Sequence, residues 1–274
     1  MTIETWLTEA TNVLKADNIS SAKLDAELIL SHTLRKQHTY LHAHGDQELD
    51  ARHKDIADAR IQLRLDHTPV AYIVGHKEFY GHRFKTTPTA LIPRPESEVI
   101  IELLTDIIPK NSSLIPTTLR LIDVGTGTGC LGISAKLEWP ELDVTLIDIS
   151  RHALNLAKEN AELLHAEVNL VKADLLHGFV DNVDIIIANL PYVDKSWDVS
   201  PDTYTEPDQA LYAPDGGLAL IKQLITQSTL VLPHGGHLLL ESDIRQQEAI
   251  IAFAKDNGFK LEIVKDLITQ FIKN

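Results

Sequence analysis

Two short segments carry residue types that suit the transfer of a methyl group to a planar nitrogen. Residues 123–129 read Asp-Val-Gly-Thr-Gly-Thr-Gly, and glycines at this spacing permit a tight turn and a close approach of the backbone to a ligand. Residues 189–192 read Asn-Leu-Pro-Tyr, which supplies oxygen acceptors, a restricted backbone and a flat ring. Together the two segments predict an S-adenosylmethionine (SAM)-dependent N-methyltransferase.

The Asn-Leu-Pro-Tyr segment predicts a clamp for an NH2 group. An amide or an aryl amine is a poor nucleophile because its lone pair is delocalised, so two acceptors aimed at its N–H bonds hold it and offset the developing charge. Asn189 Oδ1 and the Leu190 carbonyl are the expected acceptors. Pro191 restricts the backbone, and Tyr192 offers its ring to a planar substrate group. Alternatively, the segment has only a structural role, as an Asn/Pro turn with the tyrosine in the core.

The glycine-rich segment predicts a cofactor loop that opens a helix, whose free N–H groups suit a carboxylate or a phosphate. About 19 residues after this loop, Asp148 ends the next strand-like run, where a carboxylate can accept hydrogen bonds from ribose hydroxyls. Asp174 can accept from an adenine amino group while Leu175 packs on the ring, although an aspartate is equally suited to cap a helix. The expected cofactor-binding residues are Asp123, Gly125, Thr126, Gly127, Thr128, Gly129, Asp148, Asp174 and Leu175.

A second cofactor class stays open at this loop. Residues 127–132 read Gly-Thr-Gly-Cys-Leu-Gly, which matches the G-x-G-x-x-G pattern of dinucleotide-binding turns. The ribose-binding logic is common to both cofactor classes, and a tight strand-to-helix turn without a ligand would use the same glycines. The clamp downstream favours SAM.

The segments that must position these residues alternate between strand and helix patterns from Leu119 onward. Such alternation predicts βαβ units, a mostly parallel sheet and an α/β fold. Because ligands bind outside the carboxyl ends of such strands, Asp123, Asp148 and Asn189 should meet in one crevice. The expected strands are 119–124, 144–149, 168–171, 183–188 and 237–241, with helices at 151–164 and 217–231.

The first part of the chain has helical periodicity instead, and we expect a small bundle that packs on or recognises a partner. Aromatic residues around Gly81 predict a short β-hairpin, and a proline-rich stretch leads into a helix at about 99–108. We place a helical domain at 1–74, a hairpin linker at 75–96 and the methyltransferase domain at 97–274. The expected buried positions are Ile3, Trp6, Leu7, Ala10, Val13 and Leu14 in the first helix, and Ile56, Ala59 and Leu63 in the third.

Bulk properties exclude several classes of protein. A net charge of -14 disfavours a general nucleic-acid binder, which needs Lys and Arg to neutralise phosphates, and is typical of a soluble protein. No apolar run approaches the roughly 18 residues of a membrane span. The single cysteine, Cys130, fits a reducing cytoplasm. His38, His42 and His44 cluster, but no Cys or acidic residue completes a ligand set, so we expect no metal.

Six motifs occur in the order found in one family. Through them the chain resembles the peptide chain release factor glutamine methyltransferases of the PrmC/HemK type, over nearly its whole length. The resemblance implies a class I, seven-stranded methyltransferase domain behind a helical domain that contacts the release factor, and N5-methylation of the glutamine in its Gly-Gly-Gln loop. It also implies that Asn189 contacts SAM as well as the glutamine amide. The motifs are Glu78–Gly81, Leu91–Glu98, Asp123–Gly129, Asn189–Tyr192, Glu206–Leu211 and Gly235–Glu241, with Leu24–Glu27 in the helical part.

The chain departs from the family pattern at several positions. Leu190 stands where the family usually has proline, a form similar to that of rRNA adenine dimethyltransferases, so an adenine N6-methyltransferase acting on RNA or DNA is an alternative. Ser242-Asp243 replaces Ile-Gly, and the altered C-terminal tail leads us to expect a shortened or irregular last strand. These changes also leave open a SAM-binding adaptor without turnover. Arg94 and Glu96 either order the linker or pair with substrate.

Overall fold

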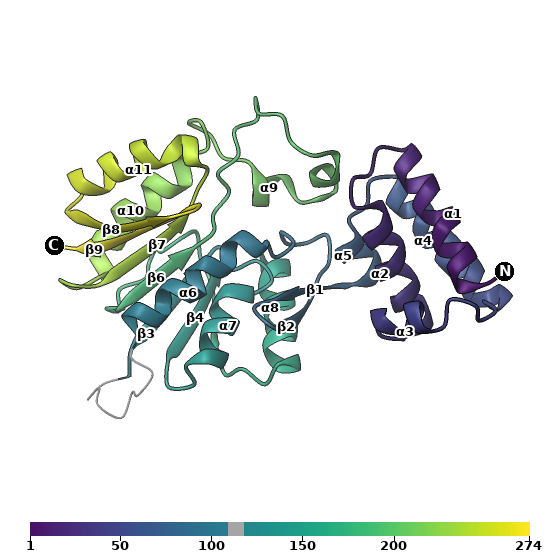
Figure 1. Cartoon of the computed structure of the whole chain (residues 1–274). Helices are drawn as coiled ribbons and strands as arrows, with labels where there is room; N and C mark the ends of the chain where they lie inside the picture. Colours follow the sequence, from purple (N-terminus) through teal and green to yellow (C-terminus); the bar gives the residue numbers. More distant parts are fainter. Residues whose placement is uncertain (109–117) are drawn as a thin grey trace. The chain divides into compact units, whose positions relative to one another are not determined.

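The computed structural model describes residues 1–108 and 118–274 (Figure 1). The chain forms two compact units. One consists of Met1–His76 together with Val199–Thr205, and the other of Lys77–Asp198 together with Glu206–Asn274. We call them the helical unit and the methyltransferase unit and describe each by itself.

The helical unit is a small bundle in which α1 and α4 begin at side-chain caps. Thr2 Oγ1 accepts from Thr5 N at the start of the first helix, and Asp50 accepts from His53 N at the start of the fourth. A core built around Trp6, Leu14 and Leu30 fills its interior. Its elements are α1 (Ile3–Ala16), α2 (Ala22–Leu34), α3 (His38–Ala43), α4 (Ala51–Leu65), α5 (Val70–Val74) and the 3-10 helix η3 (Pro201–Thr205).

The predicted buried face of α4 is wrong by about one residue. Ile56, Ala59 and Leu63 are exposed, whereas Ala57, Ile61 and Arg64 are buried. The apolar periodicity of this helix is weak, and the burial of Arg64 between two carboxylates sets which face turns inward. In α1 the prediction is confirmed for Ile3, Trp6, Ala10 and Leu14, whereas Leu7 is only partly buried and Val13 is exposed.

The methyltransferase unit contains the seven-stranded sheet, in the order β5-β4-β3-β6-β7-β9-β8. The first five of these strands pair in parallel, and β9 and β8 add an antiparallel end. The chain reverses its direction of travel across the sheet at β3, which lies between β4 and β6, so this is the topological switch point. The strands are β3 (Arg120–Val124), β4 (Asp143–Asp148), β5 (Asn169–Lys172), β6 (Ile185–Ala188), β7 (His237–Glu241), β8 (Phe259–Lys265) and β9 (Ile268–Lys273).

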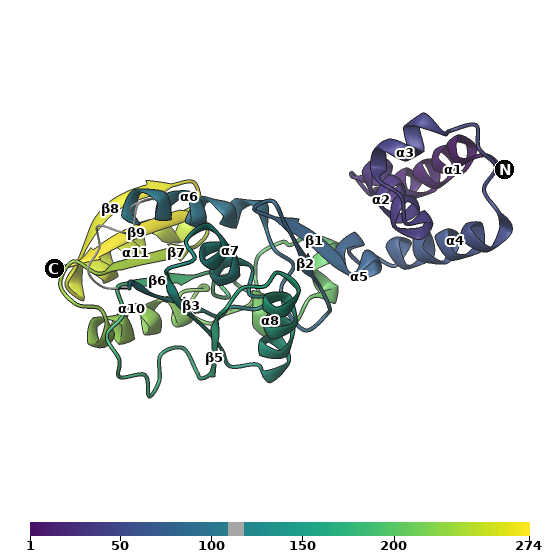
Figure 2. The same cartoon turned by 90° about the horizontal axis from the view of Figure 1, so that it is seen from below.

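Helices cover both faces of this sheet, which makes a three-layer α/β fold (Figures 1 and 2). Ile100 of α6, Ile133 of α7 and Ala157 of α8 belong to one core cluster. Leu224 of α10 and Ile250 of α11 belong to another. The predicted class I methyltransferase architecture is confirmed. The remaining elements are η1 (Pro95–Ser97), α6 (Glu98–Ile107), α7 (Cys130–Glu138), α8 (Arg151–Leu163), α9 (Asp208–Leu211), α10 (Ala219–Val231) and α11 (Ile244–Asp256).

The first hairpin and the last strand of the chain can be compared with what the sequence predicted. The predicted hairpin forms from β1 (His76–Phe79) and β2 (His82–Lys85), with Tyr80 and Gly81 at positive φ in the turn. The last strand is neither short nor irregular: β9 pairs residue by residue with β7, and the register shift lies in β8 between Leu261 and Ile263. None of the described helices is both long and apolar enough to span a membrane.

Candidate active site

The glycine-rich loop is held in place by the carboxylate that ends β3. Asp123 Oδ2 accepts hydrogen bonds from Thr126 Oγ1 at 2.5 Å and from Gly132 N at 3.0 Å. Gly125 N and Thr126 N both donate to the carbonyl of Ile147 on the neighbouring strand. Asp123 Oδ1 is buried and meets no donor among the described residues, and burial raises the pKa of this carboxyl to about 6.

Two positions of this loop favour glycine, because each has a positive φ and little room for a Cβ. Gly125 has φ +72°, and a Cβ there would lie 2.7 Å from Leu190 Cδ2. Gly129 has φ +81°, and a Cβ there would lie 2.6 Å from Ile133 Cδ1. The loop therefore passes against the clamp segment on one side and its own helix on the other, as a ligand cradle requires.

Asp148 joins the end of β4 to this loop. Its Oδ2 accepts from Gly127 N at 2.9 Å and its Oδ1 accepts from Ser150 N at 2.8 Å. Burial raises the pKa of the Asp148 carboxyl, and these backbone hydrogen bonds oppose that rise by favouring the charged form. Each carboxylate oxygen keeps a further lone pair for a ligand hydroxyl.

A cavity of about 300 Å³ opens at the carboxyl ends of β3, β4 and β6, where an α/β sheet binds its ligands. The predicted residues that line it are Gly125, Gly127, Asp148, Asp174, Leu175, Asn189, Leu190 and Pro191. Asp123, Thr126, Thr128, Gly129 and Tyr192 do not line it.

The character of the lining fits SAM. Leu175, Ile149 and Ala153 form an apolar wall for a nucleobase, and the lining carboxylates are Asp148 and Asp174. None of the described residues that line this cavity is Lys or Arg, which favours a cationic sulfonium cofactor over the pyrophosphate of a dinucleotide. Asp174 is followed by a turn and not by a helix, so it does not serve as a helix cap.

A buried polar network determines how the Asn189 side chain is oriented. Ser97 Oγ donates its only proton to Glu241 Oε2 at 2.5 Å, so its oxygen can only accept from Asn189. Asn189 Nδ2 accordingly donates to Ser97 Oγ at 2.9 Å. The amide NH2 faces this network, and Asn189 Oδ1 is the atom left to accept from a ligand.

Glu241 is the centre of that network and ends β7, next to the strand that carries the clamp. It is 1% exposed and also accepts from Tyr192 OH at 3.2 Å. Burial raises the pKa of Glu241, and burial together with the Glu241 charge raises the pKa of Tyr192. Ser97 and Glu241 had no predicted role, although the position of Glu241 at a predicted strand end was a usable signal.

The backbone of the clamp has its own support. Gln246 Nε2 donates to the carbonyls of Tyr192 at 2.8 Å and Gly216 at 2.7 Å. Gln246 is also the third helical residue of α11 and forms a capping box with Asp243. Asp243, one of the two residues that depart from the family pattern, thus caps α11, and Gln246 in the first turn of this helix supports the clamp backbone.

Arg94 orders the segment that precedes α6. Its Nη2 donates to Glu206 Oε1, and Glu206 Oε2 accepts from Ile92 N at 3.1 Å. The Glu206 side chain is 1% exposed, and Leu91 and Pro207, which flank this link, both line the cavity. Glu96 is exposed at the surface. Family motifs at 91–98 and 206–211 therefore meet at one wall of the site.

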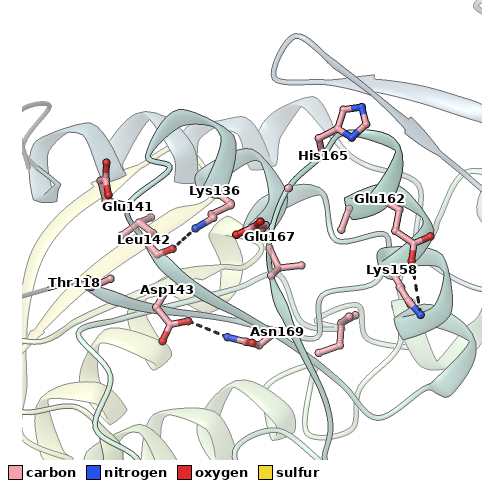
Figure 3. Close-up of a pocket in the computed structure, with 14 residues that line it drawn as sticks. Thr118, Lys136, Glu141, Leu142, Asp143, Lys158, Glu162, His165, Glu167 and Asn169 are labelled. Atoms are coloured by element: carbon pink, nitrogen blue, oxygen red, sulfur yellow. Dashed lines mark hydrogen bonds and ion pairs between the residues drawn. The ribbon is translucent and has the colours of Figure 1, made fainter.

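A larger hollow of about 820 Å³ lies at the opposite edge of the sheet, near the amino ends of β4 and β5 (Figure 3). Its polar groups largely satisfy one another: Lys136 Nζ donates to the Leu142 carbonyl at 2.7 Å, and Asn169 Nδ2 donates to Asp143 at 2.9 Å. Because ligands of such sheets bind at the carboxyl ends of strands, we assign the active site to the smaller cavity.

Two family models match the chain. The PrmC N-terminal domain matches residues 5–75, and the methyltransferase small domain matches residues 101–223. The first covers most of α1 and all of α2 to α5, and the second covers the glycine-rich loop and the clamp.

Solved structures share the fold at low sequence identity. A methyltransferase from Pyrococcus furiosus aligns with a TM-score of 0.54 and 17% identity over 79% of this chain and 98% of its own. The Thermus thermophilus 16S rRNA N2 G1207 methyltransferase aligns with a TM-score of 0.52 and 14% identity over 73% of this chain and 50% of its own. These likenesses establish a class I methyltransferase fold.

Curated relatives match the chain from end to end. The release factor glutamine methyltransferase of Deinococcus radiodurans is 33% identical over 97% of this chain and 95% of its own, and that of Koribacter versatilis is 36% identical over the same shares. The Escherichia coli protein of this name is 32% identical over 91% of this chain and 89% of its own. By these matches and the geometry of its site, the chain belongs to the release factor glutamine methyltransferase family.

Proposed function

We propose that the protein methylates N5 of the glutamine in the Gly-Gly-Gln loop of bacterial-type peptide chain release factors, with SAM as methyl donor. The observation that carries this proposal is the orientation of Asn189, whose Oδ1 is left free beside the cavity while its NH2 is held by Ser97. An acceptor at that place suits the N–H of a primary amide.

The chain's own residues would act mainly by orientation and electrostatics. Asn189 Oδ1 and the Leu190 carbonyl would accept the two N–H bonds of the glutamine amide and hold its nitrogen in line for attack. The same oxygens would stabilise the positive charge that grows on this nitrogen until it releases a proton. SAM, when bound, supplies a methyl group on a sulfonium sulfur. Gly125, Gly127, Asp148, Asp174 and Leu175 are the residues that would hold it.

Transfer of labelled methyl from SAM to a bacterial release factor tests the proposal, with a second copy whose Gly-Gly-Gln glutamine is replaced. We expect label on the first factor alone. Asn189→Ala should lower kcat by about 10²–10³-fold, the range seen when one acceptor or donor aimed at the reacting group is removed, with SAM affinity largely retained. Exposed Asn182→Ala is the matched control and should leave kcat unchanged. Label on both factors would refute the proposed acceptor.

The adenine N6-methyltransferase is the second candidate, because the Asn-Leu-Pro-Tyr form suits an exocyclic amine equally well. The net charge of -14 and the absence of Lys and Arg among the described cavity-lining residues count against it. Methylation of RNA or DNA without protein would support it. If the protein binds SAM but transfers methyl to neither class of acceptor, the remaining candidate is a SAM-binding adaptor without turnover.

We also propose a cytoplasmic location and a release factor as the binding partner of the helical unit. The proposed acceptor works on the ribosome, and the names of the curated relatives point to the same substrate. Cross-linking of the helical unit to a release factor, mapped by mass spectrometry, would test this partner.

A further inference from the structure

The helical unit contains a cluster of metal-ligating side chains outside the methyl-transfer site. Glu27 of α2 lies with His38 and His42 of α3, so the expectation that no acidic residue completes a ligand set here is wrong. His44 does not join them, because its ring stacks on Tyr40 at 3.9 Å. Glu27 is 11 residues from His38 in the sequence, and only the packing of α2 on α3 brings them together.

The three side chains converge on one point. His38 Nε2 lies 2.9 Å from Glu27 Oε2, and His42 Nε2 lies 3.7 Å from Glu27 Oε1. One ligand atom from each residue lies within 4.8 Å of the other two. Ligand atoms around a tetrahedral Zn²⁺ at about 2.0–2.1 Å are roughly 3.3 Å apart, so small side-chain rotations would complete the geometry.

The carboxylate of this cluster, Glu27, is buried, whereas the two histidines are largely exposed. Its side chain is 8% exposed, whereas those of His38 and His42 are 40% and 54% exposed. A buried carboxylate requires compensation by hydrogen-bond donors or by a cation. Lys23 offers only a distant charge, since its Nζ is 3.9 Å from Glu27 Oε1 and its side chain is 74% exposed. A divalent cation would satisfy the carboxylate fully.

We propose that Glu27, His38 and His42 form a binding site for Zn²⁺ or a similar borderline transition-metal ion. Two imidazoles and one carboxylate are a common zinc ligand set, and the exposed side of His42 leaves a fourth position for water. The two histidines are four residues apart on α3 and so face the same way. The bound ion would fasten α3 to α2.

Calorimetric titration of the metal-stripped full-length chain with Zn²⁺ tests the site. We expect one ion per chain, with affinity at least tenfold weaker in Glu27→Gln and in His42→Gln. Zn²⁺ should also raise the Tm of the parent protein but not of His42→Gln. Because His42 is half-exposed, the His42→Gln protein should fold normally. This variant therefore still tests the site if Glu27→Gln does not fold.

The chain has 13 histidines, so adventitious binding must be separated from this site. His53→Gln is the matched control, because His53 pairs with Asp50 in the same unit and is 40% exposed, like His38. It should leave Zn²⁺ affinity unchanged. Equal affinity in the parent, Glu27→Gln and His42→Gln proteins would overturn the proposal and leave the cluster as a set of histidine–glutamate contacts.

Discussion

Two buried carboxylates, one in each unit of this protein, are stabilised in opposite ways. In the helical unit, Arg64 lies between Asp25 and Asp202, with Nε donating to Asp25 at 2.7 Å and the two terminal nitrogens donating to Asp202 at 2.8 Å. In the methyltransferase unit, Glu241 is also buried and forms no ion pair among the described residues, whereas buried Glu206 of the same unit pairs with Arg94. Glu241 relies on hydroxyl groups from Ser97 and Tyr192.

The comparison distinguishes a charged group that stabilises the fold, Asp25, from one that lies in the active site, Glu241. A carboxylate held by a guanidinium is compensated, and breaking such a pair exposes a buried unpaired charge. A carboxylate held only by neutral donors keeps a raised pKa and is costly to the fold, which is typical of functional positions. Asp123 and Asp148 extend this pattern, since burial raises the pKa of both.

Arg64→Ala should produce the largest loss of stability. It removes the cation from buried Asp25, and loss of one partner of a buried pair typically costs about 3–5 kcal/mol. Hydrogen exchange of the full chain should show the loss in α2, α4 and residues 199–205. Arg52→Ala, in the exposed first turn of the same helix, is the control and should change exchange little. An equal effect of both variants would contradict the contrast between Asp25 and Glu241.

Asp123→Asn should change how stability depends on pH. The pKa of Asp123 is raised from 3.8 to about 6, so the folded state binds more protons, and the stabilisation is present below pH about 4 and lost as pH rises through about 6. A shift of about 2 units corresponds to roughly 3 kcal/mol. Urea unfolding from pH 4 to 7 should show this slope in the parent and a flatter profile in Asp123→Asn. An unchanged slope would show that other groups carry it.

Glu241→Gln should lower kcat by about 10–100-fold with little change in SAM affinity, because a neutral amide can donate to Ser97 and release the orientation of Asn189. The pKa of Glu241 is raised by burial, so in the parent kcat should fall as pH decreases through that pKa and the carboxylate becomes protonated. This acid limb should be absent in Glu241→Gln.

Exposed Glu248→Gln on α11 is the control for that variant and should keep the parent pH profile. Ser97→Ala should act on the same network, so its effect and that of Glu241→Gln should combine less than additively. Fully additive effects would show that the two residues act separately.

Arg94→Ala should have the smallest effect of these variants. Arg94 pairs with buried Glu206 at the edge of the cavity but is itself one-third exposed, and Glu206 keeps the Ile92 N–H as a donor. We therefore expect a loss of about 1–3 kcal/mol in stability and a change in kcat within about threefold. A loss of kcat well beyond tenfold with normal stability would mean that Arg94 contacts the substrate.

Local sequence determined the strand ends, the glycine-rich loop, the hairpin and the clamp. Each depends on residues close together in the chain: apolar runs end at Asp123, Asp148 and Asn189, and positive φ requires glycine at Gly125 and Gly129. Parallel strands then bring their carboxyl ends to one edge, so the meeting of Asp148 and Asn189 at one cavity followed from topology.

Tertiary structure alone decided which charged residues are buried and what they touch. Asp202 is 138 residues from Arg64, and Glu241 is 144 residues from Ser97. Periodicity reports only whether a position is apolar, so it left Arg64 out of the predicted buried face of its helix and gave Ser97 and Glu27 no role. Partners distant in sequence compensate these groups, and only packing reveals such compensation.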